Sequence, residues 1–166
     1  MANEAYTRTN QALFFARKAI ESWQQAESSD AIDALTQTQY HREHAIFHLY
    51  RGVLALIHEV ADRYRWPLVD AREVEAVLIP SVVARFPGPE LAELTELADN
   101  ADTWLASVIA AWQRLQAPPQ PVDNSTNSLI ATSATPQVEL ASAQAEEALR
   151  EVSRRVKAYR DGMQEW

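Results

Sequence analysis

Residues 40–58, YHREHAIFHLYRGVLALIH, contain all four histidines of this 166-residue chain, and their apolar pattern is typical of a long helix. Apolar residues recur in and around this stretch at the spacing of one helix face. With His41 at zero on a helical wheel, that face spans roughly 80° to 180°. It comprises Leu35, Ile46, Leu49, Tyr50, Val53, Ile57, Val60 and Tyr64. We expect this face to point into the core.

The opposite side of the same helix is polar, between roughly 260° and 360° on that wheel. It carries His41, His44, His48, Arg51, His58, Glu59 and Asp62, with the small residues Ala45, Gly52 and Ala55 on or beside it. Small residues let another helix approach closely, so we expect part of this side to be covered within the chain, with Arg51 reaching a carboxylate. A two-fold dimer through it is the alternative. We define the predicted interaction face as His48, Arg51, Gly52, Ala55, His58, Glu59 and Asp62.

Composition extends the helical pattern to the whole chain. Ala, Leu, Glu, Gln and Arg are abundant and only 3 glycines occur, a usage that favours helices. We predict an all-α protein with a four-helix-bundle-like, up-down arrangement. It would have one long second helix, a short extra helix and a long loop before the C-terminal helix. The length fits a single domain over residues 1–166.

Capping residues and a proline set the expected ends of the first two helices. The first would run from about Asn3 to about residue 27 and fold back on the second as an antiparallel hairpin. Ser28 or Ser29 would cap the second helix, which would stop where Trp66 meets Pro67. Because this second helix is longer than its neighbours, we expect a bend or an overhang.

A short third helix is expected before Pro80, because Asp70 and Glu73 have the spacing of a capping box. The sequence SVVARFPGP, residues 81–89, would then be a connector. A loop or flexible linker is predicted over residues 117–137, which hold four prolines and many Ser, Thr and Asn residues.

Two further helices show seams with alternating spacings of three and four, which is typical of helices packed nearly parallel. A fourth helix would run from Pro89 to about residue 116, with Leu91, Leu94, Ala98, Ala101, Leu105, Val108, Trp112 and Leu115 in its seam. A fifth would carry Ala145, Leu149, Val152, Val156, Tyr159, Met163 and Trp166.

Charge and composition exclude several classes of function. The net charge of −8 repels a phosphate backbone, so we expect no nucleic-acid partner. The absence of cysteine excludes disulfides, thiolate metal sites and cysteine nucleophiles. The N-terminal MANEAYTR lacks a signal-peptide pattern, and no stretch approaches the roughly 18 apolar residues of a membrane span. We expect a soluble, cytoplasmic protein that contacts no membrane.

The histidines leave a metal-binding alternative open. His44 and His48, at i and i+4, could chelate a metal such as zinc, with His41 or a distant carboxylate completing the shell. No H-E-x-x-H or E-x-x-H motif accompanies them, and no other histidine cluster occurs. Histidines on a solvated or partly paired helix face are the simpler interpretation, and we predict no metal or cofactor.

A ribonuclease alternative rests on arginine–histidine spacing. Arg42 with His48, and Arg51 with His58, match the Arg-x4-6-His signature of HEPN-type ribonucleases. In such a pair the arginine stabilises the phosphorane charge and the histidine moves protons. However, Arg42 and His48 diverge on the helical wheel, at about 100° and about 340°.

Three stretches resemble a small family of uncharacterised bacterial proteins. They are NEAYTRTNQALFFARKAIESW (3–23), REHAIFHLYRGVLALIHEVADRYRWP (42–67) and PELAELTELADNADTWLASVIAAW (89–112). The resemblance implies a compact helical domain of unknown function, and it brings no activity or catalytic residues. We therefore interpret the chain as a non-enzymatic helical bundle that acts through protein–protein contacts, with another protein or a second copy as its partner.

Overall fold

The computed structural model describes residues 2–118 and 139–164, and every regular element within these ranges is a helix. The long helices are α1 (Ala2–Glu27), α2 (Ala34–Tyr64) and α7 (Ser142–Gln164). The short helices are α3 (Val74–Val77), α4 (Pro80–Arg85), α5 (Pro89–Asp99) and α6 (Trp104–Gln116). The all-α class is therefore confirmed. No helix in the described ranges combines the length and apolarity needed to cross a membrane.

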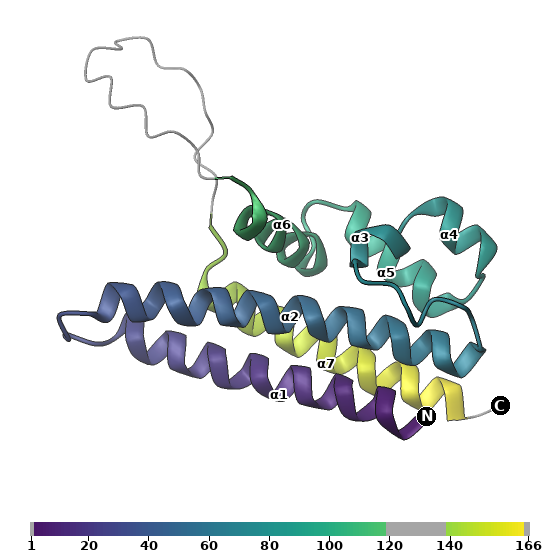
Figure 1. The fold of residues 1–166 in the computed structure, drawn as a ribbon, viewed down its shortest axis with the longest axis horizontal. Helices are drawn as coiled ribbons and strands as arrows, with labels where there is room; N and C mark the ends of the chain where they lie inside the picture. The colour runs from purple at the N-terminus through teal and green to yellow at the C-terminus, as the bar shows by residue number, and fades with distance from the viewer. Residues whose placement is uncertain (1, 119–138, 165–166) are drawn as a thin grey trace, which may run out of the picture.

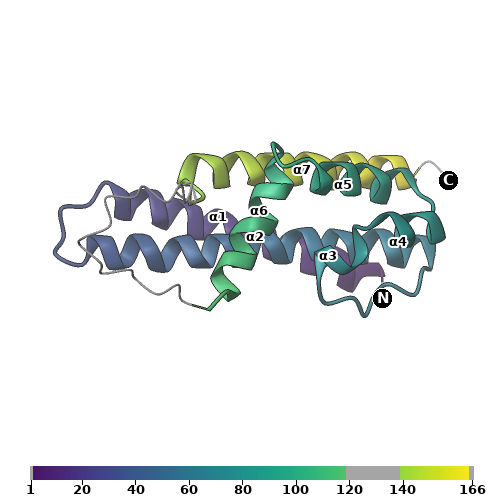
Figure 2. The ribbon, with the colours of Figure 1, turned by 90° about the horizontal axis from the view of Figure 1, so that it is seen from above.

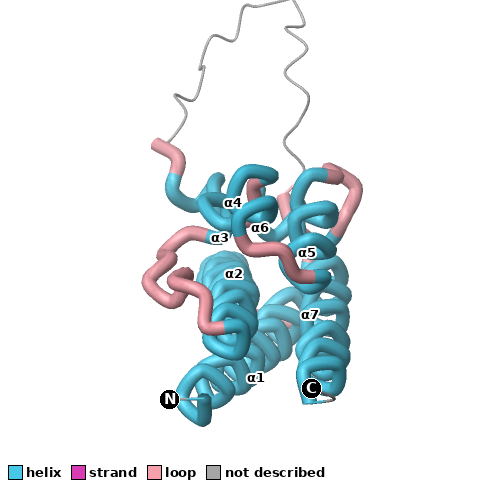
Figure 3. Tube along the Cα trace, turned by 90° about the vertical axis from the view of Figure 1, so that its right-hand side faces the viewer, coloured by secondary structure: helices cyan, strands magenta, loops and turns pink. Residues whose placement is uncertain are grey.

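The long helices form one layer and the short helices a second. Figure 1 shows α1 and α2 as an antiparallel hairpin with α7 beside both, so that α1 starts where α7 ends. The short helices lie over α2 and α7 (Figure 3), and α6 crosses α2 (Figure 2). The fourth long helix expected from the sequence is replaced by this layer.

The α1–α2 hairpin packs closely because small side chains line its contact. Ala12 and Ala16 of α1 and Ala45 of α2 are completely buried. A Cβ atom added at Gly52 would lie 3.0 Å from Cδ2 of Leu13, closer than nearly all real Cβ contacts. The predicted hairpin is therefore confirmed, with glycine at the point of closest approach.

The helix caps in this hairpin differ from those expected. Because α1 already includes Asn3, and α2 begins after Asp33, the caps predicted at Asn3 and at Ser28 or Ser29 are wrong. Ser29 acts inside the turn, where its hydroxyl accepts a hydrogen bond from the Ala31 N–H at 3.2 Å. This Ser turn competes with helix formation and so delays the start of α2.

The C-terminal end of α2 lies close to the predicted stop at Trp66 and Pro67. Arg65 adopts a left-handed conformation with φ 57°, and the Trp66 N–H donates to the Ala61 carbonyl at 2.8 Å, closing the last turn. At its other end the hairpin extends beyond both α7 and the short helices (Figure 1), which is the expected overhang.

The segment between α2 and α5 holds two short helices instead of one. Glu73 has extended backbone and makes no side-chain cap, so the predicted Asp70–Glu73 capping box is wrong. The stretch 81–89, expected as a connector, contributes most of α4, in which Pro80 occupies the first turn. Proline favours this position because its fixed φ suits a helix start and its missing N–H needs no partner there.

The helix predicted from Pro89 to residue 116 breaks after Asp99. Asn100 is extended and its side chain accepts from the Asp102 N–H at 3.0 Å, while Thr103 caps α6 by accepting from the Ala106 N–H at 3.2 Å. These side chains compete with the helical backbone for its hydrogen bonds. The continuous seam is therefore wrong, and Ala101, one of its members, is exposed.

The seam of α7 is confirmed over the described residues. Ala145, Leu149, Val152, Val156, Tyr159 and Met163 are all buried, and all belong to the main core cluster. Trp166 and nearly all of the predicted loop at residues 117–137 lie outside the described residues.

Buried tyrosines fasten the two layers together. The Tyr50 hydroxyl donates to Glu75 at 2.5 Å and accepts from the Val74 N–H at 2.9 Å, so it joins α2 to α3. Burial, together with the hydrogen bond to Glu75, raises the pKa of Tyr50 well above its usual range. Tyr159 of α7 likewise donates to Glu93 of α5 at 2.6 Å.

Candidate functional site

The histidines of α2 belong to a larger aromatic surface. Its members come from the facing parts of α1 and α2 and are joined by ring contacts. We define the aromatic–histidine surface as Phe14, Phe15, Tyr40, His41, His44, Phe47 and His48.

Ring contacts run through this surface without a gap. His48 lies at the centre, with ring centroids 5.3 Å from Phe15, 5.0 Å from Phe47 and 6.3 Å from His44. Tyr40 extends the run beyond His44, at 4.3 Å. Edge-on and tilted arrangements at such distances are favourable for aromatic rings. The rings therefore form one contiguous patch rather than scattered exposed side chains.

The patch is exposed because few of the described residues cover the first half of α2. Phe14 is 54% exposed, Tyr40 53% and Phe47 42%. The α1–α2 hairpin projects past the short-helix layer (Figure 2). Helix α6 of that layer contacts the patch through Trp112, whose ring centroid lies 5.8 Å from that of Phe47. The same helix that supplies the core thus presents an aromatic face at its other end.

His48 is the least solvated histidine in the patch. Its Nδ1 atom is buried and has no hydrogen-bond partner among the described residues. Burial is the main cause that lowers the pKa of His48, and the nearby Arg51 and His44 lower it further. The imidazole is therefore neutral at neutral pH.

The predicted interaction face is divided by the fold. Gly52, Ala55 and Glu59 are buried, whereas His48, Arg51, His58 and Asp62 remain partly exposed. Arg51, which could reach a carboxylate in a neighbouring helix, forms no ion pair within residues 2–118 and 139–164. The Nε2 atom of His58 lies 2.7 Å from the Ala71 carbonyl, which holds the loop after α2.

Glu59 is held by a buried polar cluster that joins all three long helices. Its carboxylate accepts from Nε of Arg160 at 2.6 Å and from the Thr9 hydroxyl at 2.7 Å. Arg160 also donates to Asn10 at 3.0 Å and stacks on Tyr6, with Cζ 3.8 Å from the ring centroid. The small residues of the predicted interaction face therefore pack against α1. The negative charge of Glu59 is neutralised by Arg160 of α7.

The geometry offers little support for the metal alternative. The rings of His44 and His48 are 6.3 Å apart between centroids, and Tyr40 packs against both His41 and His44. Among the described residues, no three His, Asp or Glu side chains gather as a metal site requires. The i, i+4 histidine pair is thus built into the aromatic patch without a third ligand nearby.

The ribonuclease alternative needs arginine and histidine to converge, and Arg42 does not meet His48. Arg42 forms an ion pair with Glu139, at the start of the segment that leads into α7. His48 instead contacts Phe15 and Phe47. In the second pair, His58 bonds to the Ala71 carbonyl, and no hydrogen bond joins it to Arg51 among the described residues.

Sequence reasoning missed the aromatic members of the patch, although a signal for two of them was present. On the wheel used for the histidines, Tyr40 and Phe47 fall at about 260° and about 240°, beside the polar stripe. Phe15 could not be assigned in this way, because its contact with His48 depends on how the hairpin packs, and Phe14 joins the patch only through Phe15.

These features define an all-helical protein with an exposed aromatic–histidine patch on its longest hairpin. The model of DUF6586, a family of unknown function, matches residues 1–166, so the chain belongs to that family. The comparison with curated proteins found no match, and neither did the comparison with solved structures.

Proposed function

We propose that residues 1–166 form a single protein-interaction domain without catalytic machinery, and that a second copy of the chain docks on the aromatic–histidine surface. The observation that supports this proposal is the unbroken run of ring contacts from Phe14 to Tyr40, in which the outer rings are about half exposed. Contiguous exposed apolar surface is typical of interaction sites, whereas scattered apolar residues are normal on any protein.

Charge favours this surface as the meeting point of two copies. Each copy has a net charge of −8, so two copies repel each other over most of their surface. None of the seven side chains of the patch is a carboxylate, and the lowered pKa of His48 keeps its ring neutral. Aromatic side chains are enriched, and carboxylates depleted, at the centres of protein interfaces.

The overhang makes the contact sterically feasible. A two-fold dimer brings the same patch of both copies together, so the aromatic rings of one copy meet aromatic rings of the other. Because the hairpin projects beyond α7 and the short helices (Figure 1), its projecting part is open to the approach of a second hairpin.

Analytical ultracentrifugation over a concentration series tests this proposal. We expect the wild-type protein to sediment as a dimer, and the double variant Phe15→Ser/Phe47→Ser to sediment as a monomer with unchanged helical circular dichroism. The matched control is Val69→Ser, which replaces an apolar residue of similar exposure, 47%, in the loop after α2. It should remain dimeric.

A wild-type chain that stays monomeric at all accessible concentrations would contradict the proposal. So would a double variant that dimerises as strongly as wild type. Equal losses in the double variant and in Val69→Ser would show that association uses another surface.

A further inference from the structure

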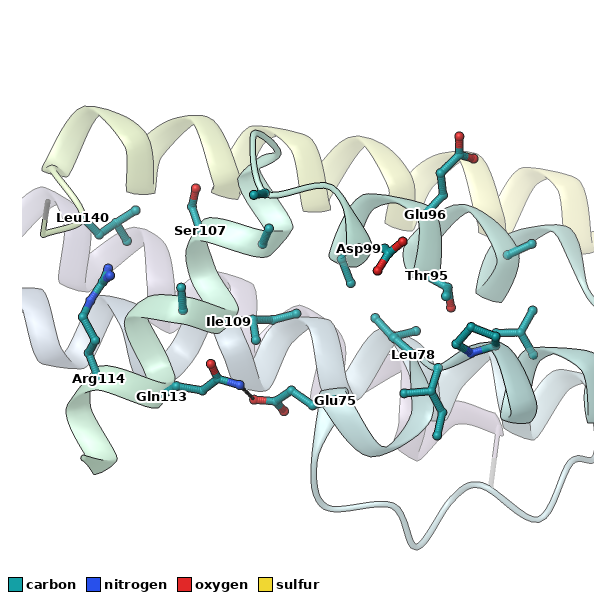
Figure 4. Close-up of a pocket in the computed structure, with 18 of the residues that line it drawn as sticks. Glu75, Leu78, Thr95, Glu96, Asp99, Ser107, Ile109, Gln113, Arg114 and Leu140 are labelled. Atoms are coloured by element: carbon teal, nitrogen blue, oxygen red, sulfur yellow. Dashed lines mark hydrogen bonds between the residues drawn. The ribbon is translucent and has the colours of Figure 1, made fainter. Parts of the chain in front are cut away.

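The short-helix layer encloses a groove that shares no residue with the aromatic–histidine surface. The groove has a volume of about 1100 Å³, is open to solvent, and lies among α3, α4, α5 and α6. In Figure 4, Leu78 and Ile109 lie between α5 and α6, and Thr95 and Asp99 come from α5. Arg114 and Leu140 lie at the opposite end of the groove.

The lining has the chemistry of a helix-binding groove. Large apolar side chains such as Leu78, Val83 and Ile109 form part of it. Its remaining apolar surface is mostly alanine: Ala84, Ala92, Ala98, Ala101, Ala106 and Ala110. Small side chains let the backbone of an incoming helix approach closely, and the apolar residues offer contact to one face of that helix. The volume exceeds the roughly 300–1,000 Å³ of most small-molecule pockets.

Negative charge at one end of the groove has no counter-ion in the described chain. Glu96 and Asp99 form no ion pair there, whereas the neighbouring Glu75 is satisfied by Tyr50 and by Gln113 at 3.2 Å. Both free carboxylates lie in the last turn of α5, which contains no basic residue. The carbonyl end of a helix carries partial negative charge, so two carboxylates there repel it. A cation supplied from outside would relieve this repulsion.

Two further polar groups in the groove are available to a ligand. The Thr95 hydroxyl is shielded from solvent and makes no hydrogen bond with the described residues. Arg114, at the far end, forms no ion pair with them. The charge pattern along the groove is therefore negative at the Asp99 end and positive at the Arg114 end.

We infer that this groove binds an amphipathic helix of a partner protein, with apolar residues on one face and Lys or Arg at the end that meets Glu96 and Asp99. Apolar contacts to Leu78 and Ile109 supply affinity, and the cations set the direction of the helix. This inference is independent of self-association, because the two surfaces share no residue.

Fluorescence anisotropy with labelled model helices tests the inference. The probe is a short helical peptide of Leu, Ala and Lys with the leucines on one face. One comparison peptide carries Glu in place of Lys, and another has the same composition but no apolar face. We expect the full-length protein to bind only the first peptide, and to bind it more weakly as salt rises.

Variants locate the site. Glu96→Gln/Asp99→Asn should weaken binding by roughly tenfold, since the variant removes two ion pairs at the rim of the interface. Ala110→Phe, which fills the groove, should also abolish most of the binding. The matched control Asp30→Asn/Glu147→Gln removes two exposed carboxylates that lie outside the groove, and it should bind like wild type.

Three results would overturn the inference. Equal weakening in the control variant would show attraction to the net negative charge alone. Unchanged binding in Ala110→Phe would place the peptide elsewhere. A third result is that the Lys and Glu peptides bind with equal affinity and that only Ala110→Phe abolishes this binding. The groove would then bind apolar ligands and would need no cation from them.

Discussion

The two halves of α2 differ in how deeply their large apolar side chains are buried. In the second half Leu56, Ile57 and Val60 are completely buried, whereas in the first half Leu35 is 83% exposed and Tyr40 and Phe47 are about half exposed. Leu35 was expected in the core, and so was Tyr64, which is 39% exposed at the other end of the helix; both expectations are wrong.

The difference between the halves comes from what covers them. Helix α2 as a whole contacts α1, α3, α6 and α7, but its first half projects with α1 beyond most of the fold (Figure 1). A periodic apolar face therefore becomes core only where enough other elements meet it. Where they do not, as at Leu35 in the first half, a residue of that face stays exposed.

Truncating one leucine in each half gives the largest test of this comparison. We expect Leu56→Ala to lower the free energy of unfolding by about 2–5 kcal/mol, since it leaves a cavity in a packed core. Leu35→Ala should change it by less than about 0.5 kcal/mol, because the side chain is already solvated. Urea denaturation followed by circular dichroism measures both. Similar losses in the two variants would mean that the overhanging half is covered in solution.

Removing the partner of Glu59 should have the next largest effect. Arg160→Met leaves the Glu59 carboxylate in a largely buried cluster without its cation. We expect the free energy of unfolding to fall by about 2–3 kcal/mol, a range at the low end for buried pairs because both side chains keep some exposure. The double variant Glu59→Met/Arg160→Met removes both charges and should recover much of that loss. Thermal denaturation of the three proteins checks this. If the double variant is less stable than Arg160→Met, the pair is not the main source of the effect.

Filling the close contact between α1 and α2 should cost about 1–3 kcal/mol. Gly52→Leu places a side chain where even a Cβ meets Leu13 at 3.0 Å. The control Gly162→Leu lies where nothing is within 4 Å of the added Cβ, so it should be neutral or slightly stabilising, because leucine favours helices more than glycine. Unfolding of Gly52→Leu at the wild-type midpoint would show that the hairpin is looser than this spacing indicates.

A pH titration gives the smallest effect and probes the first half alone. Burial, Arg51 and His44 lower the pKa of His48 in the folded chain, so the unfolded chain takes up this proton at a higher pH than the folded chain does. The contribution of His48 to the free energy of unfolding is therefore fully present above about pH 6.5. It is lost as the pH falls toward the pKa of His48 in the folded chain.

Chemical denaturation between about pH 7.5 and about pH 5.5 measures this dependence while keeping most carboxylates ionised. The variant His48→Gln should flatten the curve relative to wild type. His41→Gln retains His48 and should retain the slope. A wild-type slope that survives in His48→Gln would assign it to other groups.

Several elements could be read from local sequence alone. The three-and-four spacing of α7 placed its buried residues correctly, because a helix repeats its faces regardless of what surrounds it. The break between α5 and α6 was also encoded locally, in Asn100 and Thr103. The apolar spacing across this break, which resembles one continuous seam, obscured those two signals.

Other features needed the tertiary structure. Glu59 and Arg160 are 101 positions apart, and the groove is lined by residues of five helices, α3 to α7, so no window of the sequence contains either site. The histidine stripe could be placed on one side of α2, but periodicity carries no information on which neighbours reach that side. The sequence by itself determined that the chain is helical and which residues share a helix face, because caps and periodicity act over a few residues. Only the tertiary structure decided which faces became core, polar cluster or exposed aromatic patch, because burial depends on elements distant in the chain.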